Sequence, residues 1–163
     1  MAATRAELLA KLDSLEIATQ TRDHAAVFTV EEARHLRGEI PGGHCKNLFL
    51  KDKKDQLWLV VCLEDARIDL KTLPDKIGAA RISFGKPELL MEFLGVEPGS
   101  VTPFAVINDH QARVKVILDA AMMREPLLNY HPLENTATTS IAARDLVRFL
   151  TALNHAPQII AVS

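Results

Sequence analysis

The sequence lacks the features of a secreted or membrane protein. Its 163 residues include two cysteines, Cys45 and Cys62, and neither belongs to a Cys-x-x-Cys pair. Cysteines this sparse argue against a disulfide framework and fit reduced, buried thiols in a cytosolic protein. The first eleven residues carry three charges and no continuous apolar stretch, so we expect no signal peptide. No run approaches the roughly 20 apolar residues of a membrane helix. We therefore expect a cytoplasmic protein with no membrane attachment.

Several signatures of catalytic and metal sites are also missing. The sequence contains no Gly-x-Ser-x-Gly elbow, no Walker loop and no Gly-x-Gly-x-x-Gly. His44 and Cys45 would point to opposite faces of a strand, and no second pair has zinc spacing, so we expect neither a metal nor a cofactor. Serine and cysteine nucleophiles have no obvious base. A hydrolase built from this chain would activate water or borrow a group from its substrate.

The chain has no excess of basic charge. Lys and Arg number 19 against 21 Asp and Glu, for a net charge of −2. This balance argues against a protein that coats nucleic acid, and no helix-turn-helix signal favours DNA binding. The charge is uneven, however. Residues 44–86 hold nine Lys and Arg against six Asp and Glu, a net +3, and the remainder is net −5. Local fields depend on this placement more than on the total.

The sequence does have enough apolar residues for a core. At 48% hydrophobic and 25% charged, a chain of this length can fold without disulfides or metals, and we assign residues 1–163 to one domain. Helical and strand signals alternate in a mixed order, which predicts an α+β or mixed α/β fold and not a doubly wound sheet.

Periodicity and breaker residues predict the individual elements. Helices are expected over residues 3–15, 29–37, 73–80, 87–94 and 141–153, the last capped by Thr139 or Ser140. Hairpins are expected over residues 44–51 with 56–63, and over 104–107 with 113–118. Residues 57–63 are apolar on both faces and should form a central strand.

Lys46 is the first candidate for a binding residue. Alternation along residues 44–51 places it on the same face as Leu48 and Leu50, and places Asn47 with Phe49. An ammonium on an apolar face is costly unless it is paired or reaches water. A lysine that extends to solvent near a strand end and a pocket lysine that binds an anion both fit this pattern. The preceding Gly42-Gly43 would let a ligand approach the backbone.

Two further segments admit either a structural or a catalytic interpretation. Gly99-Ser100-Val101-Thr102-Pro103 is a turn by composition, or a loop that presents N–H groups to an oxyanion. His131 lies beside an apolar run, where histidine is more often structural than catalytic. The polar cluster that follows is explained in part by helix capping. It consists of Asn135, Thr136, Thr138 and Thr139.

Taken together, three segments resemble the YbaK/prolyl-tRNA-synthetase-associated editing domains, and above all the free-standing ProX branch. They are residues 41–50 (PGGHCKNLFL), the loop 99–103 and residues 129–139 (NYHPLENTATT), in the family's order. The resemblance runs from about residue 25 to residue 155. It implies a mixed, largely antiparallel curved sheet flanked by helices. It also implies an enzyme that hydrolyses the ester of mischarged Ala-tRNA(Pro), without metal, by means of water and the terminal ribose hydroxyl.

The resemblance assigns roles to residues at matching positions. Lys46 and Asn47 become polar anchors for the tRNA terminus, Gly99 to Pro103 a backbone cradle, and His131 part of the pocket lining. The implied catalytic set is Lys46, Asn47, Gly99 and His131. The implied substrate-binding set is Val27, Phe28, Gly42, Gly43, Ser100, Val101, Thr102, Pro103, Asn135 and Thr136. Val27 and Phe28 are expected to form a wall that admits alanine and excludes proline, since methylene contacts alone discriminate by only about 1–3 kcal/mol.

Three alternatives stay open at this point. The shared lysine and loop do not separate an alanine-specific branch from one that acts on Cys-tRNA(Pro) or another mischarged tRNA. A noncatalytic module that binds an aminoacyl-tRNA end or a synthetase would keep the same pocket. The expected partners are the tRNA(Pro) 3′ end and, in addition, prolyl-tRNA synthetase or an elongation factor. A protein that binds only a single-stranded tRNA end needs few cations. The net positive charge of residues 44–86, which include Lys46, agrees with this.

Overall fold

The computed structural model describes residues 2–26 and 40–163. The α-helices are α1 (Arg5–Ser14), α3 (Leu73–Ile77), α4 (Pro87–Leu94) and α5 (Ala143–Ala152). Short 3₁₀ helices are η1 (Pro98–Ser100), η2 (Pro103–Asn108) and η3 (Met122–Arg124). The strands are β1 (Thr19–Asp23), β2 (Gly43–Asp52), β3 (Leu57–Leu63), β4 (Ile82–Phe84), β5 (Val114–Asp119), β6 (Leu127–Tyr130), β7 (Ala137–Ala142) and β8 (Gln158–Ile160).

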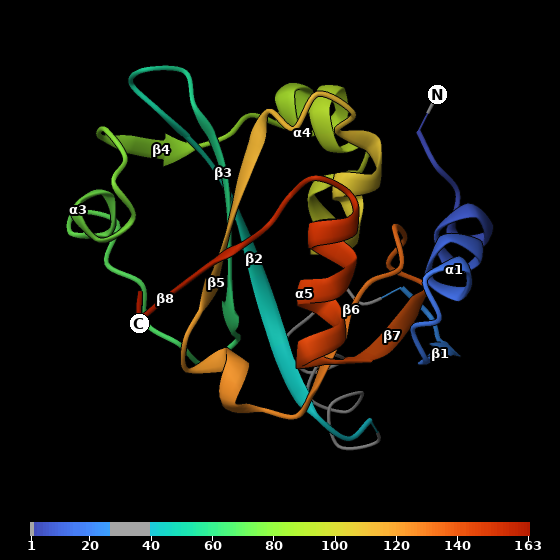
Figure 1. The fold of residues 1–163 in the computed structure, drawn as a ribbon. Helices are drawn as coiled ribbons and strands as arrows, with labels where there is room; N and C mark the ends of the chain where they lie inside the picture. Colours follow the sequence, from blue (N-terminus) through green and yellow to red (C-terminus); the bar gives the residue numbers. More distant parts are fainter. Residues whose placement is uncertain (1, 27–39) are drawn as a thin grey trace.

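All of these strands join one mixed sheet. Its order is β1-β7-β6-β2-β3-β5-β8, and β4 pairs with β2 off this path. The pairs β1–β7, β6–β7, β2–β3 and β2–β4 are antiparallel, whereas β2–β6, β3–β5 and β5–β8 are parallel. Figure 1 shows α5 on one side of β2, β3 and β5, and α3 on the other. The predicted mixed, mostly antiparallel sheet flanked by helices is confirmed.

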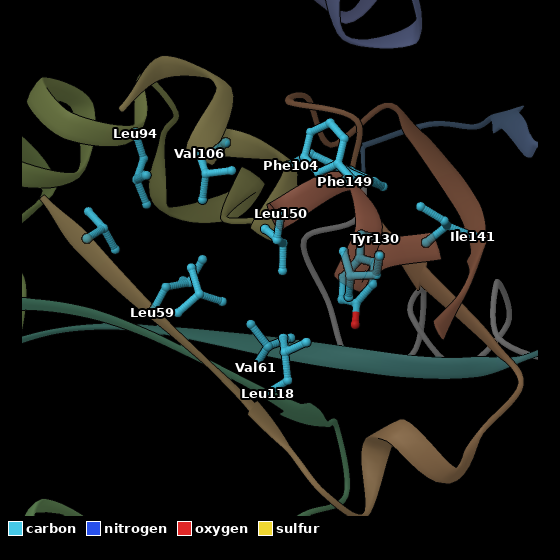
Figure 2. Packing of buried hydrophobic residues seen from close by; sticks show 14 of the residues in the cluster. Leu59, Val61, Leu94, Phe104, Val106, Leu118, Tyr130, Ile141, Phe149 and Leu150 are labelled. Atoms are coloured by element: carbon cyan, nitrogen blue, oxygen red, sulfur yellow. The ribbon is translucent and has the colours of Figure 1, made fainter. Parts of the chain in front are cut away.

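The two faces of β3 bury two separate apolar clusters. Leu59 and Val61 lie in the cluster that includes Phe104 of η2 and Leu150 of α5, and Figure 2 shows Leu150 between the β3 residues and the Phe104 ring. Val60, on the opposite face, packs in the cluster that includes the residues of α3. Because both faces are buried, the central position predicted for residues 57–63 is confirmed.

Local signals in the sequence account for the hairpin and for two helices. The predicted hairpin of residues 44–51 with 56–63 is confirmed, and its register runs from Cys45 opposite Leu63 to Lys51 opposite Leu57. Thr4 and Glu7 form a reciprocal capping box that begins α1. Pro87 begins α4, and Gly95 ends it in the left-handed conformation at φ 65°.

The predicted second hairpin is wrong. Residues 104–107 lie in η2, not in a strand, and β5 pairs in parallel with β3. Thr102 caps η2 by accepting the Phe104 N–H, and Pro103 supplies a helical φ at its first position. The fully buried Phe104 ring then meets Tyr130 and Phe149 edge to face, at 5.9 and 5.5 Å. This aromatic packing outweighs the strand propensity of the segment.

The predicted start of the last helix is also wrong. Residues 137–142 form β7, and α5 begins at Ala143 with Ala142 at its N-cap and no side-chain cap. Thr139 instead exchanges a 2.7 Å hydrogen bond with Thr21 of β1, and Ser140 donates to Asn129. These hydroxyls therefore connect strands.

Short strands escaped the sequence analysis altogether. β1, β4 and β8 have three to five residues each and too little alternation to predict. The predicted helix over residues 29–37 and the predicted wall residues Val27 and Phe28 lie outside the described residues. Over the described part of the chain, no helix combines the length and apolarity that a membrane crossing needs.

Candidate functional site

One edge of β2 is covered only at its two ends. β6 pairs with its first residues, Gly43 and His44, and β4 pairs with its last, Leu50 to Asp52. Between them, residues 45–49 have no strand partner on this edge among the described residues, although the Phe49 carbonyl accepts from the Gly85 N–H next to β4. We call residues 45–49 of this edge the open edge of β2. Unpaired strand edges present free N–H and C=O groups to other molecules.

Asn47 is at the centre of the open edge. Toward β3, His44 accepts a main-chain hydrogen bond from Glu64 at 2.9 Å. On the opposite side, Phe49 accepts one from Gly85, also at 2.9 Å. Main-chain direction alternates along an antiparallel strand, so the N–H and C=O of Asn47 face away from β3, as those of Phe49 do. The main chain of Asn47 therefore offers one donor and one acceptor at the open edge.

The Asn47 side chain adds an unused acceptor. Its Oδ1 is buried, and within residues 2–26 and 40–163 it is the one buried side-chain nitrogen or oxygen that has no hydrogen-bond partner. A buried polar group left without a partner costs about 1–3 kcal/mol. An orphaned acceptor at an unpaired strand edge is suited to an N–H or O–H donor of a ligand.

Lys46 points to the other face of β2. It shares that face with Leu48 and Leu50, which pack on the α3 side, and this alternation was predicted. Its half-buried ammonium donates to the main-chain oxygen of Ala66 at 2.5 Å. An ammonium has three donors, so this bond leaves two for an anion. No hydrogen bond within the described chain joins Lys46 to loop 99–103 or to His131.

His131 follows β6 and is held in one orientation. Its Nδ1 lies 3.0 Å from the main-chain oxygen of Ala137, an acceptor, so Nδ1 carries the proton. Burial lowers the pKa of His131 below the ordinary 6.5, and the charge of His24 lowers it further, although the Ala137 carbonyl acts in the opposite direction. At neutral pH the ring is therefore neutral, and Nε2 carries a lone pair that can accept a proton.

The loop 99–103 is only partly a free cradle. Ser100 donates its N–H to Glu97 at 2.9 Å, and Thr102 is fully buried as the cap of η2. A Cβ added to Gly99 would lie 3.6 Å from the Nδ2 of Asn135. The structure therefore brings Gly99 and Asn135 together. Val101 packs against the apolar cluster that contains Leu59 and Phe104, and Pro103 is buried. These two residues therefore anchor the loop to the protein interior.

The segment that carries Asn135 is anchored on both sides. Thr136 donates from its Oγ1 to Glu134 at 2.9 Å, and its main-chain oxygen accepts from the N–H of His24, also at 2.9 Å. Thr138 contacts Nε2 of His24 at 2.8 Å. The sequence analysis missed His24, because an isolated histidine at the end of a polar strand carries no motif.

Gly42 and Gly43 are explained by close backbone packing. Gly42 has φ 104°, and a Cβ there would lie 2.9 Å from the main-chain oxygen of Leu127. Asn129, which sequence reasoning also missed, locks this turn: its Nδ2 donates to Pro41 at 3.0 Å and to Gly43 at 3.2 Å. A polar asparagine within the otherwise apolar strand β6 could have indicated that its side chain has a structural role.

A pocket of about 480 Å³ lies beside the two glycines. Its lining includes Ala66, which accepts from Lys46, and four carboxylates. They belong to Glu64, Asp65, Asp119 and Glu125.

Both cysteines are free and poorly reactive. Burial raises the pKa of Cys45 to about 12 and that of Cys62 to about 11, so both are thiols at neutral pH. In the part of the chain that the structure describes, no three His, Cys, Asp or Glu residues are grouped to hold a metal ion.

Comparisons with known proteins agree on one family. The model of the aminoacyl-tRNA editing domain matches residues 24–149. The chain is 39% identical over 146 residues to the prolyl-tRNA editing protein ProX of Acetoanaerobium sticklandii, covering 89% of each chain. It is 36% identical over 161 residues to the prolyl-tRNA synthetase associated domain-containing protein 1 of Mus musculus, covering 96% of this chain and 95% of that one.

Solved structures support the same fold. One described as a candidate trans-editing enzyme for prolyl-tRNA synthetase superposes with a TM-score of 0.75 at 18% identity, over 100% of this chain and 99% of that chain. At this identity the likeness concerns the fold alone. The family model and the ProX relative carry the assignment further: this chain belongs to the aminoacyl-tRNA editing domain family.

Proposed function

We propose that this protein is a trans-editing deacylase that hydrolyses the ester of mischarged Ala-tRNA(Pro). The relative from Acetoanaerobium sticklandii is named a prolyl-tRNA editing protein, and the similarity extends over nearly the whole of both chains. The choice of alanine follows the resemblance to the ProX branch, especially in residues 135–139. A Cys-tRNA(Pro) deacylase is the alternative within the same family.

The observation that carries the proposal is the state of Asn47. Within residues 2–26 and 40–163, a buried oxygen without a partner and a main chain without a strand partner on the open edge of β2 coincide at one residue, Asn47. A buried acceptor without a donor lowers the stability of the folded protein. A substrate that donates a hydrogen bond to this acceptor would remove that penalty on binding. The 3′-terminal ribose and the aminoacyl group of a charged tRNA both carry suitable O–H and N–H donors.

The chemistry needs no protein nucleophile. An aminoacyl ester is already activated, so orientation of a water and stabilisation of one oxyanion are sufficient for hydrolysis. In the proposed mechanism Nε2 of His131 accepts a proton from the attacking water or from the ribose hydroxyl. Main-chain donors around Gly99 face the developing oxyanion, where one such donor is worth about 3 kcal/mol.

Lys46 is proposed as the anchor for the charged tRNA terminus. Its bond to Ala66 leaves two N–H donors, and a phosphate can compete for the third because charged acceptors bind an ammonium more strongly than a carbonyl does. We further propose that the protein acts in the cytoplasm, where free thiols such as Cys45 and Cys62 persist. Prolyl-tRNA synthetase or an elongation factor is the proposed protein partner.

The deciding experiment follows ester loss from labelled Ala-, Cys-, Ser- and Pro-tRNA(Pro) with purified protein. We expect rapid loss of alanine and retention of proline. Faster loss of cysteine than alanine would assign the chain to the Cys-tRNA(Pro) branch. Binding of the charged tRNAs without turnover on any of them would instead identify a noncatalytic module.

A further inference from the structure

Arg5 of α1 connects two acidic residues that are far apart in sequence. Its Nη1 lies 2.6 Å from Asp23 Oδ1, at the end of β1, and 3.1 Å from Glu134 Oε1, in the segment between β6 and β7. The Arg5 side chain is 24% exposed, against 44% for Glu134 and 77% for Asp23. The guanidinium is thus the most enclosed member of the group, and it joins the N-terminal helix to the 131–136 segment.

Glu134 occupies a constrained position. Leu133, just before it, has φ 71°, a left-handed conformation that costs a non-glycine residue about 1 kcal/mol or more. The same Oε1 that meets Arg5 also accepts a hydrogen bond from Thr136 Oγ1 at 2.9 Å. Glu134 and Thr136 are the chain neighbours of Asn135, and the Glu134 carboxylate bonds to Thr136 as well as to Arg5. This carboxylate therefore restrains the backbone on both sides of Asn135.

Asn135 is the residue of this segment that meets the candidate site. Its Nδ2 lies against Gly99, and the segment begins at His131, whose Nδ1 is tied to Ala137. A displacement of Glu134 would move Asn135 away from Gly99. Shifts of about 1 Å in positioning groups are enough to lower a rate a hundredfold.

α1 does not need Arg5 in order to fold. Thr4 and Glu7 cap the helix, and Leu8 and Leu12 are fully buried in the main core. Exposed ion pairs contribute about 0–1 kcal/mol to stability. The Arg5–Glu134 contact therefore contributes little to the stability of the fold.

We propose that Arg5 is a positioning residue for the editing reaction, which holds Glu134 so that Asn135 stays against the Gly99 loop. This inference rests on the proposed function, because the loop matters only if the ester is bound there. One guanidinium nitrogen, Nη1, draws together the acidic ends of β1 and of the 131–136 segment, because it carries two N–H groups and contacts both carboxylates.

The test compares Arg5→Ala, Glu134→Ala and the double variant with wild type in deacylation of Ala-tRNA(Pro). Arg148→Ala is the matched control. Arg148, on α5, also pairs with a carboxylate, Asp145 at 2.9 Å, and donates to Leu15, but no hydrogen bond or ion pair among the described residues joins it to the 131–136 segment. We expect Arg5→Ala to lower kcat about threefold to tenfold with little change in KM, and Arg148→Ala to leave both unchanged. Arg5→Lys, which keeps the positive charge, should recover part of the loss. The double variant should lose no more than Glu134→Ala alone.

A second readout is independent of turnover. The main-chain amide signals of Asn135 and Thr136 in a ¹⁵N correlation spectrum should shift in Arg5→Ala and stay in place in Arg148→Ala. Unmoved signals, or a kcat equal to that of wild type, would overturn the role of Arg5. If wild type itself hydrolyses none of the charged tRNAs, the proposed function fails, while the spectra still decide whether Arg5 holds the segment.

Discussion

His155 and Asp109 form a buried pair between the end of α5 and the turn before β5. Nε2 of His155 lies 2.9 Å from Asp109 Oδ2, and the two side chains are 1% and 2% exposed. The other ring nitrogen, Nδ1, lies 2.7 Å from the main-chain oxygen of Leu153. Both ring nitrogens therefore have a polar partner, and the ring ties the end of α5 to the turn before β5.

Removal of one member of this pair should be strongly destabilising. Asp109→Ala leaves the buried His155 ring without its partner and also removes the acceptor of the Arg113 and Val114 N–H groups, which donate to Asp109 at 3.1 and 2.8 Å. We expect a loss of about 3–5 kcal/mol in the free energy of unfolding, measured by urea titration. Asp145→Ala, which breaks an exposed pair, is the control and should cost under about 1 kcal/mol. Equal losses in Asp109→Ala and Asp145→Ala would show that the buried pair contributes no more to stability than the surface pair does.

Stability should fall in acid because of two buried carboxylates. Burial acts to raise the pKa of Asp109, but the hydrogen bonds from His155 and from the N–H groups of Val114 and Arg113 hold it below the ordinary 3.8. For Asp52, burial again acts to raise the pKa, and Trp58 Nε1 with three main-chain N–H groups holds it below 3.8.

A carboxylate with a lowered folded pKa stabilises the protein above its unfolded pKa and loses that contribution as the pH falls through the folded value. The urea midpoint should therefore fall gently below about pH 6.5, where the unfolded chain protonates His131 more readily than the folded protein does, and should drop further from about pH 4 downward as the two carboxylates protonate. The drop should be shallower in Asp52→Asn. A midpoint that rises on acidification would contradict the assigned directions of both pKa shifts.

The local parts of this fold were predictable from sequence, and the parts decided by tertiary packing were not. The β2–β3 hairpin, α4 and the face assignment of Lys46 follow from alternation, Pro87 and Gly95, all of which act within a few residues. The stretch from Phe104 was misassigned because its ring is placed by Tyr130 and Phe149, which are distant in the sequence.

The candidate site divides in the same way. The motif segments named Asn47, His131 and the Gly99 loop as candidates, but alternation could not show that, among the described residues, the edge of β2 opposite β3 is unpaired at Asn47. That depends on where β6 and β4 meet the strand. The contribution of Arg5 and Asn129 was equally hidden, since each acts on a segment about 90 residues or more away.

The state of His131 predicts an acid limb in the pH–rate profile. Its pKa lies below 6.5 because of burial and of His24, so the neutral ring is already the main form at pH 7. The rate of deacylation should be flat above neutrality and fall tenfold per unit below the pKa of His131. His131→Gln should remove this limb along with most of the activity. A limb unchanged in position in that variant would assign it to another group.

Asn47→Ala should separate stability from activity. The substitution deletes a buried oxygen that has no partner, so the usual penalty for truncation is offset by the removal of an unsatisfied group. We expect the free energy of unfolding to stay within about 1 kcal/mol of wild type or to rise. Asn129→Ala is the contrasting control, because Asn129 makes three hydrogen bonds, and it should lose about 2 kcal/mol or more. If Asn47→Ala lost as much unfolding free energy as Asn129→Ala, Asn47 would have a structural role.

The central claim is that the open edge of β2 binds the aminoacyl end of Ala-tRNA(Pro) for hydrolysis. The most direct measurement is single-turnover loss of labelled alanine from tRNA(Pro), compared between wild type, Asn47→Ala and Lys46→Ala at equal folded concentration. The account predicts rapid loss with wild type and a decrease of about a hundredfold or more in both folded variants. Ester loss in wild type no faster than in buffer, or full activity in Asn47→Ala, would contradict it.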